Sequence, residues 1–212
     1  MQDFMQLFAN NRDWAERMRA QDPNYFSNLA EQQAPDYLWI GCSDSRVPAN
    51  QLLGLPPGTV FVHRNVANIV AHGDLNCLSV MQYAIDVLKV KHVILCGHYR
   101  CGGIRAVLDG QKFGIIDNWL AHIQDVRERH EAKLDGLDAE ARWRKLCAIN
   151  VVEQLHNAAM SSVVREAWGR GQKLWLHGFI YDVGDGLLRD LKVSAVTMRD
   201  FATCYNQALA TL

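Results

Sequence analysis

The sequence lacks a marked excess of charge of either sign. Lys and Arg number 22 and Asp and Glu number 23, which gives a formal net charge of -1 at pH 7. A chain with this balance has no electrostatic reason to attract nucleic acid or an anionic membrane surface. We therefore expect a small-molecule substrate and no nucleic-acid partner.

Long apolar runs are also missing. The longest apolar stretches, such as HVILC at 92–96, are far shorter than the roughly 20 residues that span a bilayer. The opening stretch, MQDFMQLFANNRDW, mixes acidic, amide and apolar residues and lacks the basic region followed by an apolar run of a secretory signal. We expect a soluble protein without a membrane partner.

Cysteines are too sparse for a disulfide framework. Six of them are spread through 212 residues, without the dense spacing of a disulfide-stapled secreted domain. Reduced thiols and a cytoplasmic location fit this usage better. Each cysteine is then apolar filler, a metal ligand or a nucleophile, and filler is the default unless reactive residues surround it. Only Cys42 and Cys101 have such surroundings in the sequence.

What is present is a regular alternation of strand and helix patterns. Short apolar, β-branched runs predict strands at 37–41, 59–63, 91–97 and 173–180. Helical periodicity predicts two helices within the first ~35 residues and further helices at 74–88, 114–131, 138–169 and after Thr197.

Such an alternation favours an α/β fold, a single domain with a central, mostly parallel β-sheet flanked by helices. With 49% hydrophobic and 21% charged residues, the composition is that of one ordinary globular domain over 1–212. We expect residues 1–35 to form a helical N-terminal arm and residues 36–212 to form the α/β catalytic core.

Reactive residues follow two of the predicted strands. The peptide CSDSR begins at Cys42, after the first strand, and GHYRCGG brings His98 and Cys101 after the third. Ligands bind outside the carboxyl ends of parallel strands, and two thiolates with one imidazole form a catalytic zinc set whose fourth position is open. Gly102 and Gly103 give the backbone freedom to approach the ion closely. The sequence predicts a Zn²⁺ site if the first and third strands are neighbours.

Asp44 and Arg46 lie beside the first predicted ligand. Zinc with two thiolates and a neutral imidazole is formally neutral and can still acidify a bound water toward a pKa of ~7. The Asp44 carboxylate can orient the resulting hydroxide, or it can occupy the fourth position itself. A two-pronged ion pair with Arg46 would keep it off the metal. The alternative is a local surface ion pair worth ~0–1 kcal/mol.

Three motifs together resemble the β-carbonic anhydrase family: CSDSRVP at 42–48, FVHRNVAN at 61–68 and GHYRCGG at 97–103. The likeness covers nearly the whole chain. It implies a zinc-dependent lyase that reversibly hydrates carbon dioxide to bicarbonate and a proton by zinc-bound hydroxide. It also implies that Cys42, His98 and Cys101 hold the zinc. Asp44 and Arg46 are then the catalytic pair, with Asp44 able to become a fourth ligand.

The resemblance is closer to the bacterial, bicarbonate-regulated (type II) branch. In that branch a second bicarbonate binds away from zinc and stabilises the form in which the aspartate caps the metal. The matching residues here are Trp39, Arg64 and Tyr181. A guanidinium can pair with the anion while an indole N–H and a phenol O–H donate hydrogen bonds. The alternative is that Trp39 and Tyr181 pack in the core and Arg64 makes an ordinary ion pair.

A substrate cleft is implied by the same resemblance. Its residues here are Gln33, Phe61, Val66 and Tyr83, of which Phe61 and Val66 could equally be core. An apolar pocket suits carbon dioxide, and one amide can donate to a bicarbonate oxygen. In the family this cleft lies at a subunit interface, which implies a homodimer or a homotetramer built as a dimer of dimers.

Other readings of the residues remain open at this stage. A zinc-stabilised binding module with a closed fourth position, or a related hydrolase of another small carbon compound, would use the same ligands. A thiol phosphatase is disfavoured because three residues, not five, separate Cys42 from Arg46. The histidines other than His98 have no cysteine or carboxylate neighbours of comparable quality in the sequence.

Overall fold

The structure, a computed structural model, describes residues 2–31 and 33–212. By its internal contacts the chain divides into two compact units, Met1–Ala34 and Pro35–Leu212. The first unit contains two helices, as predicted: α1 (Gln2–Gln21) and α2 (Tyr25–Glu31). The assignment of the whole chain to one domain stays a prediction.

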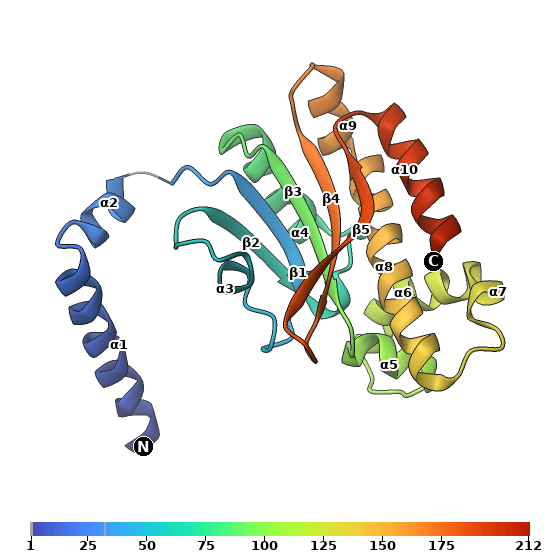
Figure 1. Cartoon of the computed structure of the whole chain (residues 1–212), viewed down its shortest axis with the longest axis horizontal. Helices are drawn as coiled ribbons and strands as arrows, with labels where there is room; N and C mark the ends of the chain where they lie inside the picture. Colours follow the sequence, from blue (N-terminus) through green and yellow to red (C-terminus); the bar gives the residue numbers. More distant parts are fainter. Residues whose placement is uncertain (1, 32) are drawn as a thin grey trace. The chain divides into compact units, whose positions relative to one another are not determined.

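A five-stranded sheet forms the centre of the second unit, in the order β2-β1-β3-β4-β5 (Figure 1). The strands are β1 (Tyr37–Cys42), β2 (Val60–Asn65), β3 (His92–His98), β4 (Trp175–Asp182) and β5 (Leu187–Ala195). The first four are mutually parallel, and β5 runs antiparallel to β4. The predicted α/β class with a mostly parallel sheet is confirmed, and the four predicted strands are present.

β5 was not predicted from the sequence. Its residues, LLRDLKVSA, are mainly half-exposed or exposed and include three charged side chains, so the segment lacks the apolar run of a buried parallel strand. It is an edge strand that pairs antiparallel with β4. Charged edge strands are common because they discourage pairing with other chains.

The helices of this unit connect the strands and cover the sheet. They are α3 (Ala49–Leu53), α4 (Leu75–Gln82), α5 (Gly102–Leu108), α6 (Ile116–Arg129), α7 (Glu131–Leu134), α8 (Ala139–Met160), α9 (Ser162–Gly169) and α10 (Met198–Thr211). A 3-10 turn, η1 (Val66–Asn68), follows β2, and a π-helical turn, η2 (Tyr83–Val87), extends α4. No helix in the described ranges 2–31 and 33–212 is long and apolar enough to cross a membrane.

The prediction of one helix over 138–169 was wrong. Ser161 has extended backbone angles (φ -62°, ψ 149°), which end α8, and its hydroxyl accepts a hydrogen bond from the Val164 N–H at 3.3 Å. A serine at this position is a good N-cap, so it begins α9 directly after the break. Apolar periodicity continues through the break, and for that reason the pattern did not reveal it.

Helix α8 packs on β3 and β4 and is buried along most of its C-terminal half. Gly97 in β3 allows the close approach of α8, and Gly178 in β4 allows the close approach of a β5 side chain. A Cβ atom on Gly97 would lie 2.4 Å from Cγ2 of Val151, and one on Gly178 would lie 2.5 Å from Cγ1 of Val193 and 3.4 Å from Cδ2 of Leu155. The strand end that carries His98 is therefore held directly against α8.

Candidate metal centre

The sheet register brings the three predicted ligands together. β1 and β3 are neighbours, with Gly41 opposite Cys96, so Cys42 and His98 end adjacent strands at the same edge. Cys101 directly precedes α5. One ligand atom from each of the three lies within 4.8 Å of the others, and the Sγ atoms of Cys42 and Cys101 are 4.0 Å apart. All three side chains are buried.

His98 is oriented as a metal ligand. Its Nδ1 lies 2.9 Å from the Tyr99 carbonyl oxygen and can donate to it, which leaves the lone pair on Nε2. That Nε2 is fully buried and has no hydrogen-bond partner within the described residues. A buried, unpartnered ring nitrogen between two thiols is costly unless a cation binds it. The residues present therefore fit zinc.

The two thiols share a hydrogen bond that makes one of them acidic. Their mutual hydrogen bond lowers the pKa of Cys42, with a further contribution from His98, and raises the pKa of Cys101. One proton therefore leaves easily, and the second is retained until a cation compensates the charge. Two thiolates and an imidazole are a zinc donor set with an open fourth position.

Hydrogen-bond donors far away in sequence support the two cysteines. The Ala67 N–H donates to Cys42 Sγ at 3.4 Å, from a residue in the left-handed region (φ 65°). Asn150 Nδ2 on α8 donates to the Ala67 carbonyl at 3.0 Å, and Trp143 Nε1 donates to the Cys101 carbonyl at 3.0 Å. Sequence reasoning missed these partners because no local pattern marks them.

The expected role of Gly102 and Gly103 in a close approach to the ion stays a prediction. Neither has a positive φ, and both begin helix α5. The left-handed residue of this loop is Arg100, with φ 61°. A Cβ on Gly103 would lie 3.2 Å from both Leu120 Cδ2 and Val66 Cγ1, so this glycine serves close packing.

Asp44 and Arg46 form the two-pronged ion pair anticipated from the sequence. Arg46 Nε donates to Asp44 Oδ1 at 2.9 Å, Nη2 donates to Oδ2 at 2.6 Å, and the Arg46 backbone N–H also donates to Oδ1. These hydrogen bonds lower the pKa of Asp44 to about 2. Asp44 Oδ2 lies 3.7 Å from His98 Nε2, so the carboxylate stands beside the metal position.

A cavity of about 480 Å³ opens beside this centre. Its lining includes one predicted cleft residue, Val66, together with Asp44, Arg46, Arg100, Gly102, Gly103, Arg105, Ala106, Gln111, Phe113, Ile116, Leu120 and Trp143. Most of these come from η1, α5, α6 and α8.

Phe61 and Tyr83 do not line this cavity. Their rings contact each other, with centroids 5.9 Å apart. Phe61 is the register partner of Leu38, which lies four residues before Cys42 in β1. Four residues of a strand span about 13 Å, so Phe61 lies about that far from the ligand end of the sheet. Gln33 belongs to the N-terminal unit, so its role in the cleft stays a prediction.

Trp39, Arg64 and Tyr181 lie on one face of the sheet. Trp39 and Tyr181 belong to one apolar cluster on the face opposite α8, and Arg64 is the register partner of Gly41. A Cβ on Gly41 would lie 2.3 Å from Trp39 Nε1, so the indole lies over this glycine, next to Arg64. The Trp39 Nε1 is buried without a hydrogen-bond partner among the described residues.

Arg64 links this group to the metal loop. Its Nε donates to the Cys42 carbonyl at 2.9 Å, and its Nη2 donates to the Asp44 carbonyl. Arg64 therefore does not make the ordinary ion pair that was considered as an alternative, because both of its acceptors are backbone oxygens. The same arginine therefore borders Trp39 and holds the backbone on both sides of Ser43.

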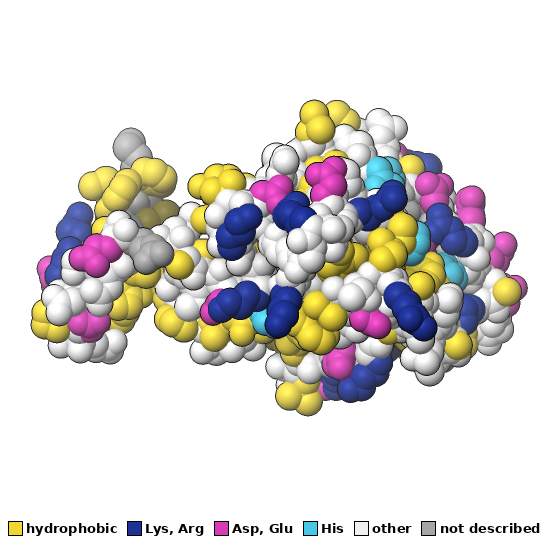
Figure 2. Space-filling view, turned by 90° about the horizontal axis from the view of Figure 1, so that it is seen from above, with side chains coloured by type: hydrophobic (Ala, Val, Ile, Leu, Met, Phe, Trp, Pro, Cys, Tyr) yellow, Lys and Arg dark blue, Asp and Glu magenta, His cyan; other side chains and the backbone are white. Residues whose placement is uncertain are grey.

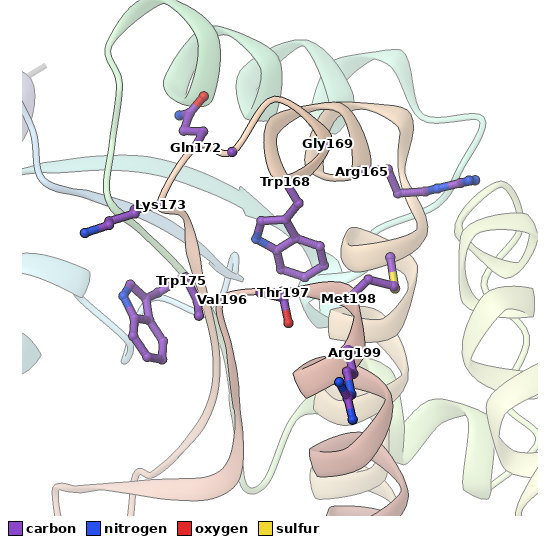
Figure 3. Close-up of a pocket in the computed structure, with 11 residues that line it drawn as sticks. Arg165, Trp168, Gly169, Gln172, Lys173, Trp175, Val196, Thr197, Met198 and Arg199 are labelled. Carbon is purple, nitrogen blue, oxygen red and sulfur yellow. The ribbon is translucent and has the colours of Figure 1, made fainter.

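A second cavity, of about 890 Å³, lies near the amino end of β4. Figure 3 shows the Trp168 indole in the middle of its lining residues, with Trp175 and Arg165 on opposite sides. None of the predicted site residues lines it, so it is separate from the metal centre.

Basic and acidic side chains are interspersed on the face seen in Figure 2, in keeping with the net charge of -1.

Fold and site together define a class: an α/β zinc protein with two thiolates and one imidazole at adjacent strand ends and a cavity at the fourth position. The family profile described as carbonic anhydrase matches residues 37–188. A carbonic anhydrase of Emericella nidulans is 44% identical over 188 residues, covering 88% of this chain and 82% of the relative. One of Candida albicans is 37% identical, covering 91% and 68%.

Solved structures of β-carbonic anhydrases are also similar to this chain. The β-carbonic anhydrase of Coccomyxa, determined in complex with acetazolamide, superposes with a TM-score of 0.90 at 42% identity, covering 97% of this chain and 96% of that one. A tetrameric β-carbonic anhydrase of Sordaria macrospora superposes with a TM-score of 0.87 at 40% identity, covering 92% and 100%. The chain belongs to the β-carbonic anhydrases, and its cofactor is zinc.

Proposed function

We propose that this enzyme hydrates carbon dioxide reversibly to bicarbonate and a proton, with Cys42, His98 and Cys101 as the zinc ligands and Asp44 as the catalytic carboxylate. The observation that carries this proposal is the position of Asp44. Its carboxylate lies 3.7 Å from His98 Nε2 and is held there through both oxygens by Arg46.

When bound, zinc supplies the Lewis acidity that lets water lose a proton near neutral pH. The protein does the rest. Asp44, with a pKa of about 2, stays ionised and accepts a hydrogen bond that orients the attacking oxygen. Val66 and Leu120 give the adjacent cavity an apolar wall suited to carbon dioxide.

Replacing Asp44 by Asn tests this role. The amide keeps the shape but cannot act as an ionised acceptor, so we expect hydration activity to fall on the order of 10²-fold with zinc content unchanged. Asp109→Asn is the matched control. Asp109 is not a predicted ligand, and it makes an ion pair with Arg105, with 2.7 Å between Arg105 Nε and Asp109 Oδ2. A fully active Asp44→Asn enzyme, or an equal loss in the control, would refute the proposal.

We further propose that bicarbonate binds at Trp39, Arg64 and Tyr181 and favours a form in which Asp44 caps the zinc, as in the type II branch. Two observations support this. The buried Trp39 N–H has no acceptor among residues 2–31 and 33–212, and an anion would provide one. Arg64 has its guanidinium on the carbonyls of Cys42 and Asp44, so an anion that draws it away releases the loop that carries Asp44.

The measurement is carbon dioxide hydration against bicarbonate concentration. We expect cooperative inhibition in the wild type and weaker inhibition in Trp39→Phe, which removes the indole N–H but keeps an aromatic side chain in the core. Trp39 is not part of the catalytic site, so activity without bicarbonate should be retained. Non-cooperative inhibition, or equal inhibition of the variant, would count against a regulatory site.

We also propose that a second copy of the chain completes the cleft, in a homodimer or a homotetramer. The Phe61–Tyr83 pair is remote from the zinc cavity of its own chain, and Tyr83 is 47% exposed, which suits a contribution to another subunit. The tetrameric relative from Sordaria macrospora supports this assembly. Sedimentation of the wild type and of Tyr83→Arg tests it: an exclusively monomeric wild type with full activity would refute it.

A cytoplasmic location stays a proposal that fractionation can test.

A further inference from the structure

Three amide side chains lie on one face of helix α8 and bind the chain segment that follows β2. Asn150, Gln154 and Asn157 are spaced four and three residues apart, so they share a face of the helix. Asn150 and Gln154 are each 1% exposed, and Asn157 is half-buried. Buried amides are costly unless they are hydrogen-bonded, so their partners show what this face of α8 holds in place.

The amides hydrogen-bond to one another and to the backbone after β2. Gln154 Oε1 accepts the Val70 N–H at 2.9 Å, and Gln154 Nε2 donates to Asn150 Oδ1 at 3.1 Å. Asn157 Nδ2 donates to the Val70 carbonyl at 3.0 Å. Because Gln154 occupies its Oδ1, Asn150 presents its Nδ2 to the Ala67 carbonyl, to which it donates at 3.0 Å.

Ala67 has a backbone conformation that needs such support. Its φ is 65°, in the left-handed region that residues with a Cβ seldom adopt, and the residue is fully buried. In this conformation the Ala67 N–H donates to Cys42 Sγ at 3.4 Å. The hydrogen bond from Asn150 to the carbonyl of the same residue therefore holds the N–H in its direction toward the sulfur.

This hydrogen bond bears on the chemistry of the site. A thiolate that accepts an N–H hydrogen bond gives less electron density to a bound metal ion, and the ion then remains a stronger Lewis acid. We propose that Asn150, oriented by Gln154, is a positioning residue for the metal centre. It acts through Ala67 to fix the hydrogen bond to Cys42 Sγ. The inference rests on the proposed function, in which Cys42 is a zinc ligand.

The test is the absorption spectrum of the cobalt-substituted enzyme, in which thiolate ligands give a charge-transfer band in the near ultraviolet. Asn150→Leu keeps the branching of the side chain but removes its donor. We expect the band to move to longer wavelength, because the thiolate of Cys42 becomes more electron-rich. Zinc affinity in a chelator competition should fall about tenfold, because this thiolate is less well oriented.

Two further variants separate positioning from general stability. Gln154→Met has a similar length but no longer orients Asn150, so the band should move in the same direction by a smaller amount. This variant decides the question if Asn150→Leu does not fold. Asn157→Leu is the matched control, since Asn157 binds Val70 and not Ala67. It should lower the thermal midpoint and leave both the band and the zinc affinity unchanged.

The spectrum of the wild type tests the ligand set itself. A cobalt enzyme without thiolate charge transfer would refute the proposed function and this inference with it. A band that is present in the wild type but does not move in Asn150→Leu and Gln154→Met would overturn only the positioning role. An equal shift in Asn157→Leu would overturn that role too, because the cause would then be a general loosening of α8.

Discussion

Gly97 is a position at which both the fold and the metal centre depend on the absence of a side chain. It precedes the ligand His98 in β3, and an added Cβ would lie 2.4 Å from Cγ2 of Val151 and 3.3 Å from Oδ1 of Asn68. Carbon atoms pack favourably at about 3.5–4.0 Å, so the distance between β3 and α8 must increase by more than about 1 Å to admit the methyl group. Val151 is fully buried, so its side chain cannot move out into solvent.

We therefore expect Gly97→Ala to lower the free energy of unfolding by about 1–3 kcal/mol, the usual cost of overpacking a core. Zinc affinity should fall as well, because the displaced strand carries His98. Val151→Ala removes the clashing methyl groups, so the double variant should be more stable than the two single losses predict. We expect a coupling of about 1 kcal/mol or more between the two sites.

Urea titration of the zinc-loaded protein at fixed chain concentration, followed by circular dichroism, measures all four free energies. Gly169→Ala is the control: a Cβ there meets no atom of the described residues within 4 Å, and we expect a change below about 0.5 kcal/mol. Strictly additive effects of Gly97→Ala and Val151→Ala would refute the close contact between β3 and α8.

Three further predictions follow from other contacts. Removing zinc with a chelator should lower the thermal midpoint, and restoring zinc at 100 times its Kd should return about 2.7 kcal/mol, as differential scanning calorimetry would show. Trp143→Phe removes the hydrogen bond to the Cys101 carbonyl and should weaken zinc binding about tenfold in a chelator competition, whereas an unchanged affinity would contradict that supporting role. Glu153→Gln weakens the hydrogen bonds with Tyr205 and His130 and should cost about 2 kcal/mol at neutral pH. Burial opposes ionisation of Glu153, but these hydrogen bonds and Arg129 outweigh it and lower its pKa below 4.5. The stabilisation is therefore full above that pH and lost as pH falls through the folded-state value, so the gap between wild type and Glu153→Gln in urea titrations should shrink in acid; a gap independent of pH would contradict it.

Much of the fold could be predicted from local pattern. The four parallel strands are short apolar runs, which can be recognised one segment at a time. Two of them, β1 and β3, are buried on both faces, whereas β2 and β4 have partly exposed residues. The identities of the zinc ligands were legible too, because Cys42, His98 and Cys101 follow strand ends within short motifs. β5 could not be predicted because it is a charged edge strand. The break at Ser161 could not be predicted because the apolar pattern continues on both sides of it.

The sequence by itself determined which residues carry the chemistry, and the tertiary structure decided which of them meet. Pairing of β1 with β3 joins Cys42 to His98, whereas the length of β2 separates Phe61 from the cavity that Val66 lines. Contacts across 25 or more positions, such as Ala67 with Cys42, leave no periodic trace in the chain. They arise only when strand register and helix packing are set together.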